Sequence, residues 1–270
     1  MTVDCIGDEE RDHVAHLEVD FGELNLLSPD AISELRGAPD LVPDDVSVLT
    51  VRAASSHEDG AGSDESDDDV PGLSAGLDLT ATRDLSAREA RPVIQDLREA
   101  ISGIRDCLAV TVCSCGPYAL GAGLELAMAC NVRLATDDAA LGLPEVDVGL
   151  VTGIQGGLLV RLVGLQAAKE LIYTGEVVSG TEAADLGLVN EAVPPAEYDE
   201  AVDRWADRLA AKSPLVLRRQ KEVFRSWRSR GIEEGIEHSA EAIAACFDTH
   251  DQAEAMAAFL DGREPRFEGR

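Results

Sequence analysis

The spacing of apolar residues divides the chain into an α/β part followed by an all-helical part. Three short runs have the alternation or the β-branched content of strands: residues 13–19, 46–53 and 108–113. From residue 196 onward, apolar residues recur at helical spacing almost to the end. We therefore predict a core over residues 1–195 and a helical region over residues 196–270.

The third strand run leads into the most informative local pattern. Gly116 and Pro117 predict a turn after it, and the sequence LGAGLELAMAC that follows predicts a helix with a glycine-rich first turn. Backbone N–H groups are free at a helix N-terminus and can receive a negatively polarised atom. We therefore expect a site for chemistry near residue 121.

Charge narrows the range of partners. The chain has 23 Lys and Arg residues against 52 Asp and Glu residues, a formal net charge of −29, so nucleic acid is not expected to bind. Its lysines are only three: Lys169, Lys212 and Lys221. A carboxylate-rich surface with so little lysine keeps a protein soluble in salt, and we expect a halophilic source. Residues 55–70 hold seven carboxylates and predict a mobile surface loop without the spacing of a calcium site.

Neither a membrane nor a metal is expected. No run of about 18 apolar residues occurs, and the opening MTVDCIGDEE lacks the basic start and apolar run of a secretory signal, so we expect a cytoplasmic protein. Cys113 and Cys115 lack a second Cys or His pair at zinc spacing. We expect reduced thiols at all six cysteines: Cys5, Cys107, Cys113, Cys115, Cys130 and Cys246.

Two motifs resemble those of the crotonase (enoyl-CoA hydratase/isomerase) superfamily. Residues 71–79 (PGLSAGLDL) resemble its S-A-G-x-D-L loop, and residues 118–127 (YALGAGLELA) resemble its Y-A-L-G-G-G-x-E-L-A segment. Further elements follow in the family's order, and the likeness runs from residue 24 to about residue 267. It implies a crotonase-like (ClpP/crotonase) α/β spiral of ββα units, with a helical C-terminal region that forms homotrimers or dimers of trimers.

The resemblance also implies an acyl-CoA thioester site. The backbone N–H groups of Leu77 and Ala122 would form an oxyanion hole for the thioester oxygen. Arg263 and Arg266 would lie beside the CoA of a neighbouring subunit, although both are equally consistent with exposed solubility charges. Besides the two arginines, the resemblance implies these substrate-binding residues: Ala75, Gly76, Leu77, Asp78, Leu79, Thr80, Gly121 and Ala122.

Two carboxylates are the candidate acid and base. Glu125 lies in an apolar run where an unpartnered carboxylate is costly to bury, whereas Glu145 could belong to an exposed turn. Their separation of twenty residues matches that of the paired glutamates in family members that hydrate enoyl thioesters. Adding water needs one group to activate it and one to supply the α-proton. The pair therefore favours reversible syn hydration of a 2-trans-enoyl-CoA, without a metal or a cofactor beyond the CoA of the substrate.

Two alternatives stay open. Family members with one acid at these positions often isomerise a double bond, so an enoyl-CoA isomerase or another crotonase-type lyase is the rival enzyme. A non-catalytic protein of the same fold is the other rival, because residues 151–159 (VTGIQGGLL) replace the family's I-P-G-A-G-G-T-Q-R-L. In the family this stretch shapes the acyl pocket, so the acyl chain length is not predicted.

Overall fold

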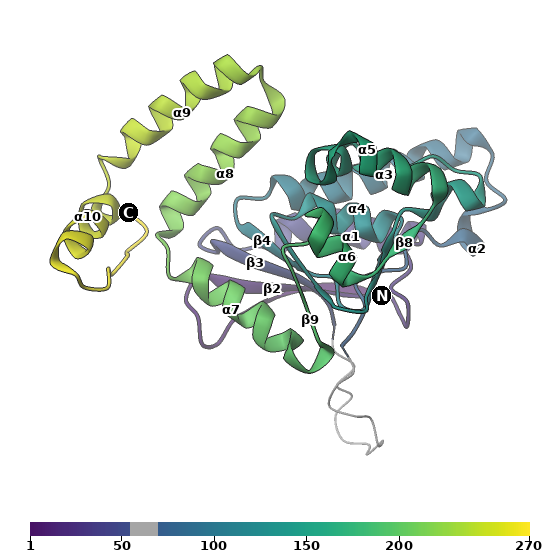
Figure 1. The fold of residues 1–270 in the computed structure, drawn as a ribbon, viewed down its shortest axis with the longest axis horizontal. Helices are drawn as coiled ribbons and strands as arrows, with labels where there is room; N and C mark the ends of the chain where they lie inside the picture. The colour runs from purple at the N-terminus through teal and green to yellow at the C-terminus, as the bar shows by residue number, and fades with distance from the viewer. Residues whose placement is uncertain (55–69) are drawn as a thin grey trace.

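The computed structural model describes residues 1–54 and 70–270, and a six-stranded sheet forms its centre (Figure 1). The first strand pairs antiparallel with the second, and every other neighbouring pair is parallel. In spatial order the strands are β1 (Thr2–Gly7), β2 (Val14–Asp20), β3 (Val48–Ala53), β4 (Val110–Ser114), β6 (Val132–Thr136) and β9 (Glu191–Val193). The three predicted strand runs are therefore confirmed as β2, β3 and β4. The acidic run predicted as a loop lies, apart from Val70, outside the described residues.

A second, smaller sheet matters more for function. It contains β5 (Tyr118–Leu120), β7 (Ala140–Gly142) and β8 (Val177–Val178) in that order. β5 and β7 are parallel, so they end at the same edge, with Leu120 opposite Gly142. β5 continues into helix α4 (Ala122–Ala129), and β7 continues into the 3-10 helix η1 (Pro144–Val148). The two segments that carry the candidate glutamates therefore start side by side.

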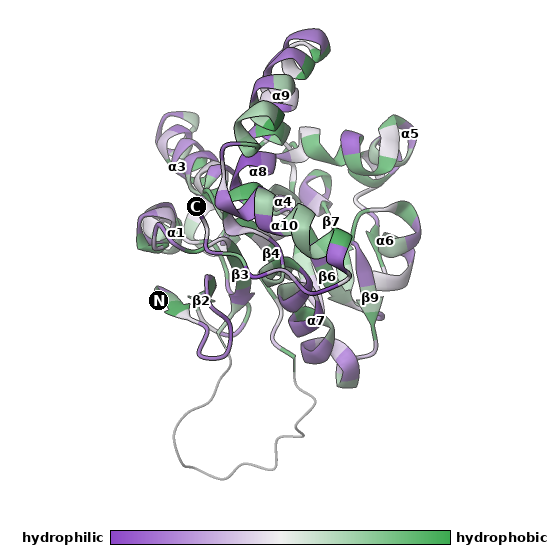
Figure 2. Ribbon diagram, turned by 90° about the vertical axis from the view of Figure 1, so that its left-hand side faces the viewer, coloured by the Kyte–Doolittle hydropathy of each residue, from purple (hydrophilic) through white to green (hydrophobic). Residues whose placement is uncertain are grey.

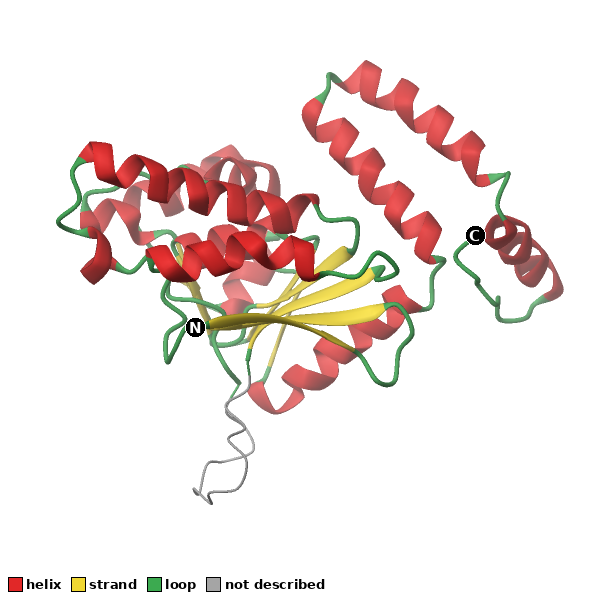
Figure 3. Cartoon of the chain, turned by 180° about the vertical axis from the view of Figure 1, so that it is seen from behind, coloured by secondary structure: helices red, strands yellow, loops and turns green. Residues whose placement is uncertain are grey.

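Helices cover one face of the large sheet (Figure 3). Ser28 caps α1 (Pro29–Leu41) by accepting the Ala31 N–H, as expected of Ser before Pro. A capping box of Ser86 and Glu89 starts α3 (Ala87–Asp106). Leucine, isoleucine and alanine side chains of α1, α3 and α4 form the main core with this face of the sheet. Apolar burial here fixes α4, and with it the glycine-rich turn, against the sheet.

The opposite face of the large sheet is covered by α7 (Tyr198–Ala210). Tyr198 is fully buried, and its hydroxyl accepts the Gly116 N–H (2.8 Å) and donates to the Leu134 carbonyl (3.0 Å). The start of the helical region thus packs with the first 195 residues. Three shorter or broken helices complete this part: α2 (Leu79–Thr82), α5 (Leu159–Thr174), interrupted at Gly164, and α6 (Gly180–Leu186).

The last three helices extend away from the sheet (Figure 1). They are α8 (Pro214–Ser229), α9 (Ile232–Cys246) and α10 (His250–Asp261). Figure 2 shows apolar stretches along α9 and α10, where Phe259 is 84% exposed and Leu260 82% exposed. Assembly through the helical region of residues 196–270 stays a prediction. Among the described residues, no helix is long and apolar enough to cross a bilayer.

Candidate active site

The backbone of residues 73–78 carries the first predicted oxyanion donor. Leu27 holds one edge of this segment, because it donates its N–H to the Gly76 carbonyl (2.8 Å) and accepts the Asp78 N–H (3.2 Å). Since both neighbours of Leu77 bond to Leu27, the N–H of Leu77 itself points to the opposite edge.

That opposite edge faces the start of α4. Leu120 donates its N–H to the Ser74 carbonyl (3.0 Å). Gly76 has a φ of +95°, and a Cβ at this position would lie 2.7 Å from the Leu120 carbonyl oxygen and 3.3 Å from the Ala122 nitrogen. Only glycine fits such a close approach with a positive φ. The structure therefore brings the Leu77 and Ala122 segments together.

Both amides are available to a ligand. Within the described residues, neither the Leu77 N–H nor the Ala122 N–H donates to an acceptor of the chain. Ala122 is the first residue of α4, where an N–H has no partner inside the helix and the helix dipole is positive. Two unpaired N–H groups next to a helix N-terminus are suited to stabilise a developing oxyanion.

Glu125 lies in the first turn of α4 and is almost completely buried, with 2% of its surface exposed. Its Oε1 accepts the backbone N–H groups of Ile154 (3.0 Å) and Gln155 (2.7 Å). Burial raises the pKa of Glu125 to about 7, although the Gln155 amide opposes that rise, and the charge of Glu145 adds to it. The reading of Glu125 as an ordinary solvent-facing acid is thereby excluded, and a carboxyl with this pKa can gain or lose a proton near neutral pH.

Glu145 lies in η1 and is partly buried. The Thr152 hydroxyl donates to its Oε2 (2.8 Å). A Cβ on Gly121 would lie 3.3 Å from its Oε1, so the carboxylate lies over the turn that precedes Ala122. Glu145 therefore lies against the turn that contains the Ala122 amide and does not project into solvent from an exposed turn.

One loop, residues 152–156, contacts both glutamates. Thr152 bonds Glu145, and the amides of Ile154 and Gln155 bond Glu125. The free N–H groups and the two carboxylates therefore surround one small region at the N-terminus of α4. Such an arrangement can polarise a carbonyl while a carboxyl pair moves protons at the neighbouring carbons.

The raised pKa of Glu125 should make the free energy of unfolding depend on pH. A carboxyl with a pKa of about 7 in the folded chain and its ordinary 4.5 when unfolded costs stability as pH rises from 4.5 to 7. The protonated form is mimicked by Gln. We expect the free energy of unfolding of Glu125→Gln minus that of the parent to be about 3 kcal/mol larger at pH 8 than at pH 4.5. Urea unfolding at both pH values measures this change, and an unchanged difference would contradict the burial effect.

The other implied substrate residues follow Leu77 along the chain. Asp78 caps α2 by accepting the N–H groups of Thr80 (2.8 Å) and Ala81 (3.0 Å). Leu79 is 45% exposed, and Ala75 donates its N–H to the Leu24 carbonyl (2.9 Å). Along the segment from Ala75 to Thr80, Gly76 is buried, Ala75, Leu77 and Asp78 are partly buried, and Leu79 and Thr80 are exposed.

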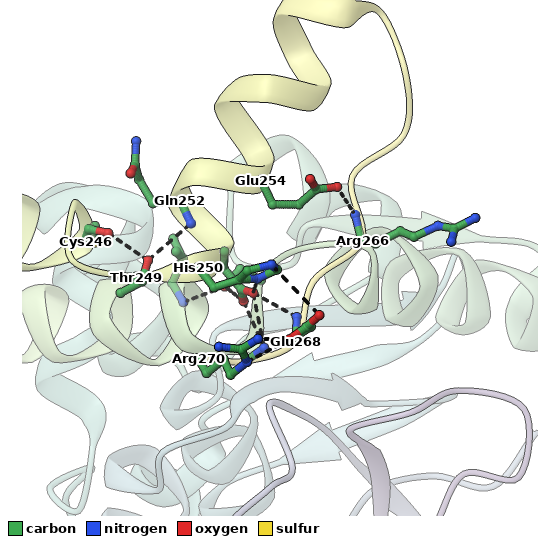
Figure 4. A network of polar contacts seen from close by, with 12 residues as sticks. Cys246, Thr249, His250, Gln252, Glu254, Arg266, Glu268 and Arg270 are labelled. Carbon is green, nitrogen blue, oxygen red and sulfur yellow. Dashed lines mark hydrogen bonds and ion pairs between the residues drawn. The ribbon is translucent and has the colours of Figure 1, made fainter.

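Arg263 and Arg266 follow α10, the last helix of the chain. The Arg263 guanidinium pairs with Glu254 (2.7 Å), and the Arg266 N–H donates to the same carboxylate (2.7 Å). Figure 4 shows the Arg266 side chain extending away from the polar network around His250 and Glu268. Neither arginine contacts Glu125 or Glu145 in the hydrogen bonds and ion pairs of the described residues, and their contact with the CoA of a neighbouring subunit stays a prediction.

Comparison with known proteins identifies the family. The family model described as enoyl-CoA hydratase/isomerase matches residues 71–270. The chain belongs to the enoyl-CoA hydratase/isomerase family. Its relatives include the crotonyl-CoA hydratase of Syntrophomonas wolfei, 34% identical over 245 residues that cover 90% of each chain. A probable enoyl-CoA hydratase of Bacillus subtilis is 37% identical over 203 residues, covering 73% of this chain and 78% of the relative.

Solved structures confirm the fold of this family member. The crystal structure of an enoyl-CoA hydratase from Bacillus anthracis matches with a TM-score of 0.87 and 26% identity, and the match covers 100% of both chains. The crotonase-like fold class predicted from the two motifs is therefore confirmed, and this chain is an enzyme of the hydratase/isomerase type.

Sequence reasoning missed the polar side chains around the glutamates in this member of the family. Thr152 and Gln155 lie in the stretch that departs from the family pattern, which we linked to the acyl pocket and to a non-catalytic alternative but not to the glutamates. Ser102 and Arg105, which bond the Gln155 side chain, lie in α3 some fifty residues away. The only sequence signal was a glutamine inside an otherwise small and apolar loop.

Proposed function

We propose that this protein is an enoyl-CoA hydratase that catalyses the reversible syn addition of water to 2-trans-enoyl-CoA, giving 3-hydroxyacyl-CoA. The observation that carries the proposal is the pair of carboxylates, Glu125 and Glu145, held by one loop beside two unpaired backbone amides. The names of relatives at 34% and 37% identity support the same activity.

The mechanism follows from the charges that develop during hydration. The amides of Leu77 and Ala122 bind the thioester oxygen and stabilise the enolate, each donor contributing roughly 3–4 kcal/mol to the transition state. One member of the Glu125–Glu145 pair takes a proton from water, and the other delivers a proton to the α-carbon. A pKa of about 7 for Glu125 allows its carboxyl to hold or release a proton near neutral pH. No metal or redox cofactor takes part in this proposal.

The CoA part of the substrate needs its own contacts. We place it along the segment from Ala75 to Thr80 and beside Gly121, with its phosphates near Arg263 and Arg266 of a neighbouring subunit. The proposed homotrimer or dimer of trimers is supported by large apolar side chains exposed on the extended helices: Phe224, Trp227, Ile236, Ile243, Phe247, Phe259 and Leu260. A carboxylate-rich surface supports a salt-rich cytoplasm as its place of action.

An assay of two reactions tests the activity. At high salt, the purified protein should hydrate crotonyl-CoA, seen as loss of the ultraviolet absorbance of the conjugated thioester, with a kcat at least about tenfold above that for 3-enoyl-CoA isomerisation. Preference for isomerisation would assign the rival enzyme class. Absence of turnover with both substrates, in a protein that melts cooperatively, would favour the non-catalytic reading.

A further inference from the structure

Gln155 has a side chain that the proposed chemistry does not use, although it is buried next to the site. It is 7% exposed, and its backbone N–H donates to Glu125. Its side-chain Nε2 donates to the Ser102 hydroxyl (3.0 Å), and its Oε1 accepts from Arg105 (2.8 Å). Both the donor and the acceptor of this buried amide are bonded to side chains of α3, and these bonds hold the Gln155 backbone in one position.

The Arg105 anchor is itself held by charge. Its guanidinium pairs with Asp106 (2.7 Å), and the same carboxylate pairs with Arg228 of α8 (2.6 Å). All three side chains are less than about a third exposed, so their bonds are screened less than those of free surface ions. A continuous series of hydrogen bonds and ion pairs therefore runs from Glu125 through Gln155 to α3 and α8.

Thr152 serves the second glutamate from the same loop. Its hydroxyl donates to Glu145 Oε2 at 2.8 Å, while Glu145 Oε1 faces the Gly121 turn. The bond fixes Oε2 of Glu145. The other oxygen, Oε1, remains free to face the region between Glu125 and the amides of Leu77 and Ala122. Thr152 also packs closely on Gly156, since a Cβ at Gly156 would lie 2.4 Å from the Thr152 methyl.

We propose that Thr152 and Gln155 are positioning residues of the hydration reaction: Thr152 orients Glu145, and the Gln155 side chain, anchored to Ser102 and Arg105, holds the loop amides against Glu125. The inference rests on the proposed function, because it assigns these residues a part in the same proton transfers. Both side chains act through the glutamates and neither contacts the reacting atoms.

Positioning of this kind has a signature beyond stability. The loop N–H groups favour the ionised form of Glu125 and so oppose the rise of its pKa by burial. Loosening them should raise the pKa of Glu125 further. The charged groups that bear on this carboxyl are Glu145 from η1 and, through Gln155, Arg105 from α3. A change at Gln155 leaves the charge of Glu145 in place, while Arg105 loses its bond to the amide and keeps its pair with Asp106. A purely structural role would lower stability by the same amount at every pH.

The test compares variants that each remove the polar contacts of one side chain: Gln155 loses its bonds to Ser102 and Arg105, Arg105 its bonds to Gln155 and Asp106, and Thr152 its bond to Glu145. Gln155→Ala, Arg105→Gln and Thr152→Val should lower kcat for crotonyl-CoA hydration roughly 10- to 100-fold with KM changed less than about threefold, because misplaced groups slow chemistry more than binding. Thr152→Ser, which keeps the hydroxyl, should recover most of kcat. Gln220→Ala, an exposed glutamine on α8, is the matched control and should retain parental kinetics.

A second measurement keeps the proposal separable from activity. The free energy of unfolding is measured over pH 5–9 for Gln155→Ala and for Gln155→Ala/Glu125→Gln, and the difference between the two reports the titration of Glu125. The same difference is measured between the parent and Glu125→Gln. The titration of Glu125 should lie at higher pH in the Gln155→Ala background than in the parent. Parental kcat and an unshifted transition in Gln155→Ala, or no recovery in Thr152→Ser, would overturn the positioning role. A parent protein without hydratase activity would overturn the proposed function instead, while the pH measurement would still report on the loop.

Discussion

Glu125→Gln and Glu145→Gln should each lower kcat for crotonyl-CoA hydration by a factor of about 10³ or more, with KM nearly unchanged. Glutamine keeps the size of the side chain and the acceptor for the amides of Ile154 and Gln155, but it cannot exchange a proton with water. Since hydration requires a proton to be removed and another delivered, either change removes one half of the acid–base pair.

The double variant sharpens this test. If the two carboxylates act as one unit, Glu125→Gln/Glu145→Gln should be little slower than the slower single variant, because effects of a cooperating pair are not additive. Glu200→Gln, an exposed acid on α7, controls for loss of charge and should keep full activity. Retention of more than about a tenth of the parental kcat by either single variant would contradict the assignment of that glutamate.

Glu125, the residue proposed to take part in catalysis, is expected to lower the stability of the fold. A buried carboxyl with a pKa near 7 costs stability above neutral pH, and Glu145 adds repulsion to that cost. The amides of the 152–156 loop offset part of it by bonding Oε1 of Glu125. Opposite effects of Glu125→Gln on stability and on activity are what a functional site under local strain produces, and a merely structural acid would not give both.

The elements of the fold were largely predictable from local patterns, whereas the convergence of the site residues was predicted only through the family resemblance. Strand and helix starts follow local rules, such as the β-branched run of β3 and the Ser28–Pro29 start of α1. Glu125 was detectable because a charge in an apolar helix is unusual. That Glu145 lies beside it depends on the pairing of β5 with β7, and a three-residue strand such as β5 leaves no periodic signal.

Contacts between side chains that are far apart in the sequence could not be predicted either. The bond between Gln155 and Arg105 joins residues fifty positions apart, and nothing in the spacing of either segment indicates the other. The placement of Arg263 and Arg266 by family resemblance stays a prediction for the same reason. Their single-chain contacts with Glu254 are local, while the proposed contact with CoA lies between subunits.

Gly123→Ala should lower kcat about 100-fold or more through the backbone alone, since a displacement of about 1 Å at a catalytic group has an effect of this size. Gly123 is in the first turn of α4, and a Cβ there would lie 2.3 Å from the Ser74 carbonyl oxygen and 2.9 Å from the Ser74 Cβ. The added methyl group would therefore force the segment of residues 73–78 and helix α4 apart. The Leu77 and Ala122 amides would then no longer converge on one oxygen.

Gly37→Ala on α1 is the matched control for this prediction, because nothing lies within 4 Å of its added Cβ. It should leave kcat unchanged and keep or slightly raise stability, as alanine favours a helix by up to about 1 kcal/mol over glycine. For Gly123→Ala, the ratio of kcat to that of the parent is measured on protein that still melts cooperatively. Full activity in such protein would mean that the two amides need not be close, and the oxyanion assignment would fail even if both glutamates proved essential.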